Sequence, residues 1–285
     1  MRVLVTGAAG MLGRALTEIL RRDYDVTGVD LDDFDLSTTG SISEIVGKSP
    51  ETVCHLAAFT DVDRCESDPL RAYHLNVVAT RNVAVACREA NCPMLYVSTD
   101  YVFNGESKEP YDVDARPGPV NMYGRTKLIG EWFVERNVPD RYIVRSSWLF
   151  GEGGKNFVET ILALSERMND LEVVDDQTGS PTYTRDLASA IKKLIERRAF
   201  GRYHITNSGS CTWYEFAVAI MRRAGAPGRT INTTVSSKLA RPARRPAYSV
   251  LDNRAYVRAT GESLRGWEEA LAEYFERRTG GGTNG

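Results

Sequence analysis

The sequence is poor in the residues from which metal sites and disulfide frameworks are built. Its 285 residues include three histidines and five cysteines, and none of them shows the Cys-x-x-Cys or His-Glu-x-x-His spacing of a zinc site. The odd number of scattered cysteines also argues against a disulfide framework. We therefore expect buried free thiols, no metal site and a reducing, cytoplasmic environment.

Long apolar runs and an excess of one charge are absent as well. The first apolar run, residues 3–5, is too short for a signal peptide, and no later segment approaches a membrane span. The 36 Lys and Arg residues nearly balance 38 Asp and Glu, for a net charge of −2, which gives no reason to expect nucleic acid or membrane as a partner. With 42% hydrophobic residues the chain can bury a core, and we expect a globular protein.

A strand, a glycine turn and a helix are predicted at the start of the chain. The apolar run 2–6 is followed by glycines three residues apart and then by apolar residues at helical spacing up to Leu20. In such a turn the backbone N–H groups face an anion, and glycine lets a pyrophosphate approach closely. A tight strand-to-helix connection is the alternative, but the context favours nucleotide binding. The residues assigned to this site are Gly7, Gly10, Met11, Leu12 and Gly13.

The second predicted strand, 25–30, ends in an aspartate. Asp30 follows the glycine turn by about 20 positions, where a carboxylate accepts hydrogen bonds from the adenosine ribose. An aspartate that only caps a turn is the alternative. Asp35 and Leu36 are candidates for the edge of the adenine pocket. Because the crowded carboxylates of this loop repel a 2′-phosphate, the sequence favours NADH over NADPH.

Small residues follow the third predicted strand, 52–56, where the carboxyl end of a strand in a parallel sheet leaves room for a cofactor. A helix is predicted to begin with Asp68 as its N-cap and Pro69 in its first turn. Asn76 lies inside this helix, either as a surface residue or with a specific hydrogen bond. The residues assigned to the cofactor cleft are Ala57, Ala58, Thr60 and Asn76.

Hydroxyl and carboxyl groups gather where the fourth predicted strand, 94–97, ends. Residues 98–101 read Ser-Thr-Asp-Tyr. At the carboxyl end of a central strand these side chains would face the ligand crevice. A Ser/Thr/Asp turn would explain the same composition, and the local sequence leaves both interpretations open.

Tyr123 and Lys127 share one face of a predicted helix because they stand four residues apart. Free tyrosine has a pKa of about 10. A nearby ammonium group favours the phenolate, which would bring the phenol toward the range of a general acid at neutral pH. An ordinary solvated pair is the alternative, so the chemical interpretation depends on the neighbouring motifs.

The alternation of strands and helices predicts an α/β fold, a Rossmann-like doubly wound parallel sheet with a smaller, partly interleaved α/β substrate domain. After the fifth strand, 141–145, the alternation becomes irregular. We expect residues 1–150 to form the dinucleotide-binding domain, with 184–200 packed on it. We expect the substrate domain to consist of residues 151–183 and 201–278.

The last part of the chain contains a basic loop punctuated by prolines. The three arginines of residues 241–245 are suited to bidentate phosphate binding, whereas a solvated loop is the alternative. Apolar residues at helical spacing from Trp267 predict a final helix that packs on the body. Residues 279–285 are predicted to be a disordered tail.

Taken together, these motifs resemble those of the extended short-chain dehydrogenase/reductases, and among them the dTDP-4-dehydrorhamnose reductase family. The resemblance extends over residues 1–275 and includes the general patterns Thr-Gly-x-x-Gly-x-x-Gly and Tyr-x-x-x-Lys. Its more specific blocks are residues 98–105, 123–131, 145–151, 175–183 and 241–253.

The resemblance implies hydride transfer from a nicotinamide to the C4 ketone of dTDP-6-deoxy-L-lyxo-4-hexulose, by NADH or NADPH, in a monomer or homodimer. It assigns proton donation to Tyr123, a hydrogen bond to the carbonyl oxygen to Thr99, and two tasks to Lys127: holding the nicotinamide ribose and lowering the tyrosine pKa. Ser98 joins the cofactor contacts. The positions assigned to the nucleotide sugar are Thr99, Asp100, Tyr101, Trp148, Asn156, Arg241 and Arg244.

Two alternatives accompany this interpretation. A related nucleotide-sugar reductase or epimerase would keep the fold and change the sugar. A non-catalytic regulatory subunit of methionine adenosyltransferase, which resembles the same family, would bind ligands without turnover. The intact set of Thr99, Tyr123 and Lys127 argues against the second alternative, because binding alone does not need an acid.

Overall fold

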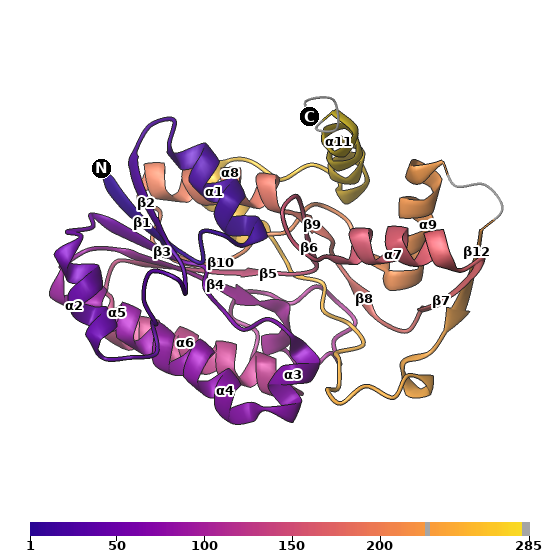
Figure 1. Ribbon diagram of the computed structural model, residues 1–285, viewed down its shortest axis with the longest axis horizontal. Helices are drawn as coiled ribbons and strands as arrows, with labels where there is room; N and C mark the ends of the chain where they lie inside the picture. Colours follow the sequence, from indigo (N-terminus) through magenta and orange to yellow (C-terminus); the bar gives the residue numbers. More distant parts are fainter. Residues whose placement is uncertain (226–228, 281–285) are drawn as a thin grey trace.

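A parallel sheet of six strands forms the larger lobe of the computed structural model, which describes residues 1–225 and 229–280 (Figure 1). Its strands are β1 (Arg2–Thr6), β2 (Asp25–Val29), β3 (Thr52–His55), β4 (Met94–Thr99), β5 (Arg141–Ser146) and β10 (Gly201–His204). They lie in the order β10-β5-β4-β3-β1-β2, and all neighbours are parallel. The strand order therefore reverses between β1 and β3, which is where such sheets bind ligands at their carboxyl ends.

Helices cover both faces of this sheet (Figure 1). On one face α1 (Met11–Leu20) packs against α8 (Thr184–Arg197), with Leu16 and Ile191 fully buried. The helices on the other face are α2 (Gly40–Gly47), α5 (Ala79–Glu89) and α6 (Met122–Asn137). Each large aliphatic side chain buried in these layers contributes about 1.5–3 kcal/mol, which gives the loops at the strand ends a rigid support.

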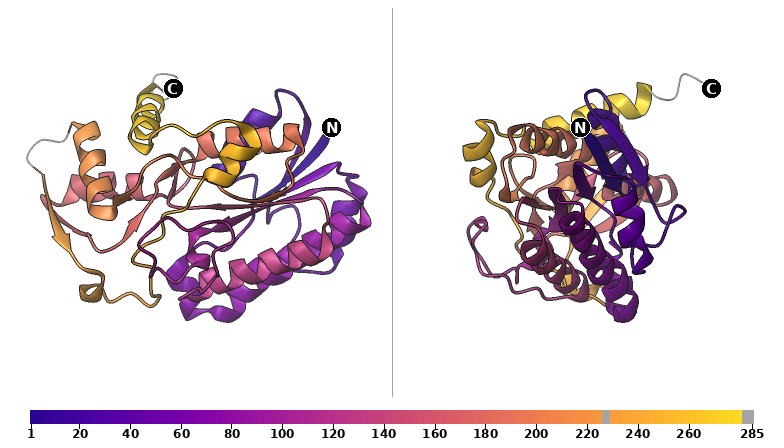
Figure 2. Two further views of the ribbon diagram at one scale, coloured as in Figure 1. Left: turned by 180° about the vertical axis from the view of Figure 1, so that it is seen from behind. Right: turned by 90° about the vertical axis from the view of Figure 1, so that its left-hand side faces the viewer.

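The smaller lobe lies beside the carboxyl edge of the sheet, because the chain enters it from the end of β5 (Figure 1, Figure 2). Its elements are α7 (Phe157–Arg167), α9 (Trp213–Ala224), α11 (Trp267–Gly280) and a parallel strand pair, β7 (Asp170–Val174) with β12 (Thr230–Thr234). Phe216 is fully buried in its core. Helix α9 begins with Thr212 as its N-cap, which forms a capping box with Glu215.

Short elements complete the fold. Strand β6 (Leu149–Phe150) pairs with β9 (Thr182–Tyr183), and β8 (Thr178–Gly179) pairs with β11 (Cys211–Thr212). The remaining helical segments are α3 (Val62–Ser67), α4 (Pro69–Tyr73), a π-helical turn (His74–Val78), two 3-10 turns (Asp100–Val102 and Ser236–Lys238) and α10 (Arg254–Thr260).

The predicted Rossmann-like fold and its first five strands are confirmed, but the placement of β10 differs from the prediction. The sequence grouped residues 201–278 with the substrate domain, yet β10 pairs with β5 and α10 packs against it. Tertiary contacts, not the local pattern, decide the partner of so short a strand. The final helix reaches Gly280, inside the predicted tail, while residues 281–285 lie outside the described part of the chain. The other domain boundaries stay predictions.

The cysteines are all free and buried, as the sequence predicted. Two histidines are buried as well, and burial lowers the pKa of His55 and of His204 to about 3, so both rings are neutral at physiological pH. Within residues 1–225 and 229–280, no helix is both long enough and apolar enough to cross a membrane.

Candidate active site

The predicted acid and its lysine lie at the start of α6, next to the carboxyl end of β4. Asn121 caps this helix, since its Oδ1 accepts a hydrogen bond from the Gly124 N–H at 2.9 Å. The Asn121 side-chain amide also donates to the Arg244 carbonyl oxygen at 2.8 Å. The cap therefore fixes Tyr123 in the first helical turn and Lys127 one turn later, where the lysine is 3% exposed.

A close backbone approach brings α6 onto the end of β4. A Cβ atom on Gly124 would lie 2.0 Å from the Tyr101 carbonyl oxygen, so only glycine fits at this contact. The approach places the ring of Tyr123 edge-on to the ring of Tyr101, with 6.0 Å between centroids. The start of α6 and the Ser-Thr-Asp-Tyr segment therefore lie against each other, and the role of that segment at a ligand crevice stays a prediction.

The phenol of Tyr123 keeps its proton at neutral pH. Burial raises its pKa above the usual value, the charge of Asp100 adds to the rise, and a side-chain hydrogen bond with Thr99 opposes it. The sequence predicted the opposite sign, with Lys127 lowering this pKa. Burial sets the direction of the shift instead, and a phenol that is fully protonated is the form that donates a proton.

The side chain of Lys127 is aimed at the interior. Its Nζ lies 4.2 Å from the centroid of the Tyr96 ring, a cation–π contact. Burial lowers the pKa of Lys127 to about 7, while the charges of Glu131 and Cys65 favour the ammonium form. Burial thus brings the lysine near its point of deprotonation, and these two groups from α6 and α3 oppose that shift.

A buried ion pair lies one turn further along α6. Glu131 receives two hydrogen bonds from Arg145, at 2.9 Å and 2.7 Å, and both residues are almost fully buried. Ser98 donates its hydroxyl to the same carboxylate at 2.5 Å. The hydroxyl of Ser98, a predicted cofactor residue, is therefore bonded to Glu131 in the core. Together with Arg145 it links α6 to β4 and β5.

Asn76 is a buried structural residue in the π-helical turn, and it is 1% exposed. Its amide exchanges two hydrogen bonds with the backbone of Phe59, at 2.7 Å and 3.1 Å, and donates a third to the Thr126 hydroxyl at 3.0 Å. The side chain predicted for the cofactor cleft thus binds the loop after β3 to α6. It supports the wall of the cleft through these bonds.

The glycine turn has the geometry that a pyrophosphate needs. Gly7 has φ +70°, and a Cβ atom there would lie 2.7 Å from the Ala57 nitrogen. A Cβ atom on Gly13 would lie 2.1 Å from the Gly7 oxygen. Gly10 precedes α1 without a side-chain cap, and no acidic residue occupies the first turn. The N–H groups of that turn, including Met11 and Leu12, are therefore suited to a bound anion.

Asp30 joins this turn to the end of β2. Its two carboxylate oxygens accept the N–H groups of Ala9, at 3.0 Å, and Leu31, at 2.9 Å. A cavity of about 710 Å³ opens beside them. Its wall carries both signs of charge, because Arg14 and Arg21 line it together with Asp30 and other carboxylates. The residues present fit a dinucleotide at the glycine turn, and the preference for NADH stays a prediction.

The other predicted cofactor residues fall into two groups. Ala57 and Ala58 lie partly buried where the loop after β3 meets the glycine turn, and Thr60 is exposed at its end. Asp35 caps a turn by accepting hydrogen bonds from the N–H and hydroxyl of Ser37, and Leu36 is buried in the core on the α5 side. Both residues therefore stabilise local structure, and their assignment to an adenine pocket stays a prediction.

An aromatic stack forms the wall on the side of the smaller lobe. Trp148 has the left-handed φ of +48°, and its ring lies parallel to that of Trp213 at 3.5 Å between centroids. A Cβ atom on Gly179 would lie 2.5 Å from the Trp148 ring. The tryptophan ring is therefore held in place from both sides.

The polar residues predicted for the diphosphate differ in whether their side chains are free to bind a ligand. Asn156 caps α7, because its Oδ1 accepts a hydrogen bond from the Glu159 N–H at 3.1 Å. Its Nδ2 donates to the Gly151 carbonyl oxygen at 2.9 Å. Arg241 and Arg244 have exposed side chains, and neither takes part in an ion pair within the described residues. Of the predicted set, these two arginines alone keep free guanidinium groups.

Arg245 holds the basic loop in place. It forms a bidentate ion pair with Asp63 of α3, with both contacts at 2.7 Å, and the same carboxylate accepts the Ala243 N–H at 3.2 Å. The sequence grouped this arginine with the phosphate ligands. No local signal could have separated it from its neighbours, because its partner lies 182 residues away.

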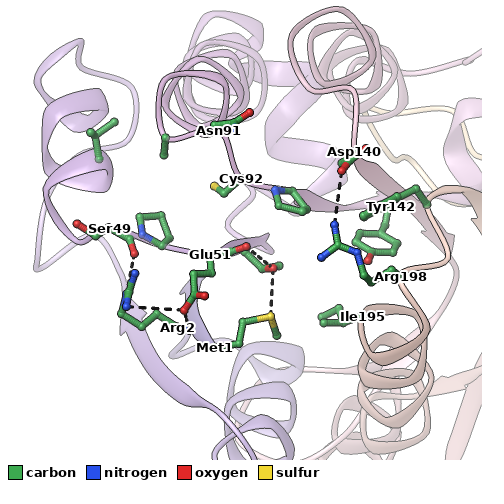
Figure 3. Close-up of a pocket in the computed structure, with 16 residues that line it drawn as sticks. Met1, Arg2, Ser49, Glu51, Asn91, Cys92, Asp140, Tyr142, Ile195 and Arg198 are labelled. Carbon is green, nitrogen blue, oxygen red and sulfur yellow. Dashed lines mark hydrogen bonds and ion pairs between the residues drawn. The ribbon is translucent and has the colours of Figure 1, made fainter.

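A second hollow, of about 730 Å³, lies at the opposite end of the sheet (Figure 3). It is lined by the residues that precede the strands, and its two labelled arginines already face carboxylates. Arg2 pairs with Glu51 at 3.7 Å, and Arg198 pairs with Asp140 at 3.8 Å. Since parallel sheets bind ligands at their carboxyl ends, the candidate active site is the one around Tyr123.

Several residues of this site were not predicted. Glu131 could have been found, because it stands four residues after Lys127 on the same helix face. Arg145 and Asp63 became visible only through long-range pairing. Trp213 gave no signal beyond a helical apolar pattern, although its ring supports Trp148.

Comparisons with known proteins agree with this geometry. The family model described as RmlD substrate binding domain matches residues 1–279. A dTDP-4-dehydrorhamnose reductase from Streptomyces griseus is 43% identical over 282 residues, which cover 96% of this chain and 93% of the relative. A dTDP-4-keto-6-deoxy-D-glucose reductase from Streptomyces niveus is 39% identical over 278 residues and is covered to 96%, as is this chain.

A solved structure gives the same result. The dTDP-4-dehydrorhamnose reductase from Bacillus anthracis str. Ames, in complex with NADP, is 38% identical to this chain with a TM-score of 0.93, and the match covers 97% of this chain and 99% of that one. The resemblance found in the sequence is confirmed. The chain belongs to the RmlD substrate binding domain family, which includes dTDP-4-dehydrorhamnose reductases and has the Rossmann-like fold of the extended short-chain dehydrogenase/reductases.

Proposed function

We propose that this protein reduces the C4 ketone of dTDP-6-deoxy-L-lyxo-4-hexulose to the alcohol, which yields dTDP-L-rhamnose. The observation that carries the proposal is a buried, protonated phenol at the carboxyl end of the central strands, with Thr99 beside it and Lys127 one turn away. The names of the relatives supply the sugar, and the site supplies the chemistry.

The nicotinamide, when bound along the glycine turn, supplies the hydride. Tyr123 donates its proton to the oxygen that becomes negatively charged as the hydride arrives. The hydroxyl of Thr99 orients the same oxygen by a hydrogen bond. Lys127 holds the nicotinamide ribose, and its ammonium charge stabilises the phenolate that remains after the proton has left.

The nucleotide sugar lies between the two lobes in this proposal. Arg241 and Arg244 bind the diphosphate, because their exposed guanidinium groups can form bidentate contacts with phosphate oxygens. Tyr101 and Trp148 contact the sugar ring. Asp100, at the end of β4, is assigned to the same sugar. Asn156 contributes indirectly, because its side chain caps and so positions the start of α7.

The experiment that tests the function measures NADH consumption. Purified protein with NADH and the dTDP-4-keto sugar is expected to oxidise one NADH per sugar and to give a product with the mass of dTDP-L-rhamnose. NADPH is run in parallel. Absence of turnover with verified substrate would contradict the proposal, and ligand binding without turnover would favour the regulatory-subunit alternative.

A second sugar is the competing candidate, because a relative of similar identity is named dTDP-4-keto-6-deoxy-D-glucose reductase. The two reactions share a site and differ in the stereochemistry of the substrate. Comparing kcat/KM for both keto sugars, with the product configuration read by NMR, separates them. An epimerase would convert its sugar with no net loss of NADH.

Lys127→Ala is expected to weaken cofactor binding and to lower kcat, each by roughly tenfold or more. The reason is that one ammonium group serves both the ribose and the phenol in the proposed mechanism. Steady-state kinetics and NADH titration by fluorescence check the two effects separately. Lys48→Ala, at an exposed position, is the control and should behave as wild type; unchanged NADH affinity in the Lys127 variant would contradict the dual role.

Asp30→Asn is expected to raise kcat/KM with NADPH relative to NADH by about tenfold, which corresponds to about 1.4 kcal/mol. The amide keeps the shape that accepts the Ala9 N–H and removes the charge that repels a 2′-phosphate. Paired assays with both cofactors measure the ratio. Asp32→Asn, in the exposed part of the same loop, is the control, and an equal shift in it would show that the whole loop sets the preference.

A further inference from the structure

Tyr96, a side chain of β4, contacts Lys127 at two points. The tyrosine is fully buried. The Nζ atom of Lys127 lies 4.2 Å from the centroid of its ring, and its hydroxyl donates a hydrogen bond to the Lys127 carbonyl oxygen at 3.3 Å. One side chain of the sheet therefore contacts both the backbone and the ammonium group of the lysine.

The face of this ring is a favourable surface for an ammonium group. The π electrons give the face a negative potential, and a cation within about 6 Å of the centroid is attracted to it, most strongly where water is excluded. No ion pair formed by residues 1–225 and 229–280 includes Lys127. The ring can therefore stabilise the charge while the N–H groups of the lysine stay available to a ligand.

Two neighbours hold the ring of Tyr96 in its orientation. On α6, a Cβ atom at Gly130 would lie 2.3 Å from the tyrosine hydroxyl oxygen, so the helix approaches the ring closely. On β3, the imidazole of His55 is stacked on the ring, with 5.7 Å between centroids and 18° between planes. The ring therefore cannot turn away from the lysine unless a helix or a strand moves with it.

The hydrogen bonds of His55 show which of its nitrogens carries the proton. The Thr80 hydroxyl donates to the Asn76 carbonyl oxygen at 2.6 Å, so it accepts at 3.0 Å from the Nε2–H of His55. Nδ1 then accepts from the hydroxyl of Thr6 at 2.7 Å. The imidazole is therefore neutral, adds no second positive charge beside the lysine, and connects the tyrosine ring to the end of β1, where the glycine turn begins.

We infer that Tyr96 is a positioning residue for the reduction, because its ring face holds the Lys127 ammonium group in the place from which that group binds the nicotinamide ribose. The inference rests on the proposed function, in which the ammonium has that task. Through His55 the same ring is linked to the glycine turn. The turn and the lysine that serve one cofactor are thus supported by one buried cluster.

The titratable groups at Lys127 and at its immediate neighbours come from five elements. They are Glu131 and Tyr123 on α6, Cys65 on α3, His55 on β3, Tyr96 on β4 and Arg145 on β5. Burial lowers the pKa of Lys127 to about 7, against the charges of Glu131 and Cys65. Because a ring face also favours the charged form, its removal should lower this pKa further, so that the ammonium is lost at a lower pH.

The first test titrates Lys127 in the free protein, without sugar or turnover. Isotope-labelled lysine reports each ammonium group by NMR, and the Lys127 signal is the one missing from Lys127→Met. Its midpoint near pH 7 is expected to fall by about 0.5–1 unit in Tyr96→Leu, because leucine fills space without a π face. Tyr96→Phe, which restores the ring, should recover the midpoint to within about 0.3 unit of the wild type.

A second replacement keeps the shape of the ring and changes only its charge distribution. Phenylalanine with three ring fluorines at position 96 packs much like Tyr96→Phe, but its face has lost the negative potential. It is expected to lower the Lys127 midpoint about as much as leucine does. This variant keeps the inference testable if Tyr96→Leu does not fold.

The third test measures NADH affinity by fluorescence titration over a range of pH. Binding needs the ammonium, so affinity should fall as pH rises through about 7, and at a lower pH in Tyr96→Leu. At pH near 7 the Kd of this variant should be raised about three- to tenfold. If the ring acts through Lys127, adding Tyr96→Leu to Lys127→Met should weaken binding no further.

Tyr142→Leu is the matched control. Tyr142 is a buried tyrosine of the adjacent strand β5, and its ring packs against Phe200. The control loses a buried aromatic ring from the same sheet, so it should lose stability in the same way. It is expected to move neither the Lys127 midpoint nor the Kd for NADH.

The outcomes separate the possible roles of the ring. A midpoint lowered by leucine and by the fluorinated ring, recovered in Tyr96→Phe and accompanied by weaker NADH binding, supports the positioning role. Unchanged midpoints, or a lowered midpoint with unchanged NADH affinity, overturn it. An equal shift in Tyr96→Phe or in Tyr142→Leu also overturns it, since the cause is then the hydroxyl or a general loosening of the core. A wild-type enzyme that does not reduce the keto sugar refutes the proposed function separately, because the titration uses the free protein.

Discussion

Tyr123→Phe is expected to lower kcat by roughly 10²- to 10⁴-fold and to leave cofactor affinity nearly unchanged. The substitution removes one hydroxyl and keeps the ring that packs edge-on against Tyr101. Burial keeps the pKa of Tyr123 above its usual value, so the phenol holds its proton at every pH near neutrality. Thr99 remains in place, but its hydroxyl is far less acidic than a phenol and does not replace the lost proton.

The measurement combines steady-state kinetics with an NADH titration. Tyr73→Phe is the matched control, because Tyr73 is an exposed tyrosine of α4, and it should retain wild-type kcat. A Tyr123→Phe enzyme with kcat within about threefold of wild type would show that another group donates the proton. Loss of NADH binding in the same variant would instead show that the phenol has a structural task.

The parts of the site that the sequence predicted are those encoded by local patterns. The glycine turn, the Asp68 helix cap and the Tyr-x-x-x-Lys face are all found in the structure. Each depends on residues within a few positions of one another, where backbone geometry restricts the outcome. Their spacing alone therefore predicts the glycine turn and the helix face that carries Tyr123 and Lys127.

The parts that could not be predicted depend on burial and on distant partners. The sign of the shift in the Tyr123 pKa follows from how deeply the phenol is packed, which spacing does not report. Arg245 has the same local sequence context as Arg244, yet only Arg245 meets the carboxylate of Asp63. Asn156 was assigned to the nucleotide sugar through the family resemblance, and the structure shows that its side chain is the N-cap of α7.

The close approach at Gly124 fixes the start of α6, and with it Tyr123, against the end of β4. Gly124→Ala therefore tests whether this contact positions Tyr123. A methyl group there would lie 2.0 Å from the Tyr101 carbonyl oxygen and 3.1 Å from the Pro119 Cβ atom. Neither neighbour can turn away, since one is backbone and the other a proline ring. The start of α6 must therefore move relative to the end of β4, and Tyr123 moves with it.

Gly124→Ala is expected to lower the free energy of unfolding by about 1–3 kcal/mol, the range for an overpacked contact. It should also lower kcat by about 100-fold, because a displacement near 1 Å of a catalytic group has that effect. Urea unfolding and steady-state kinetics measure the two quantities. Gly47→Ala is the matched control: this helical glycine has no atom within 4 Å of the added methyl group, and alanine there should stabilise the protein by about 0.4–1 kcal/mol. Wild-type activity in Gly124→Ala would mean that the site tolerates a shift between α6 and β4, and the positioning role assigned to this contact would be wrong.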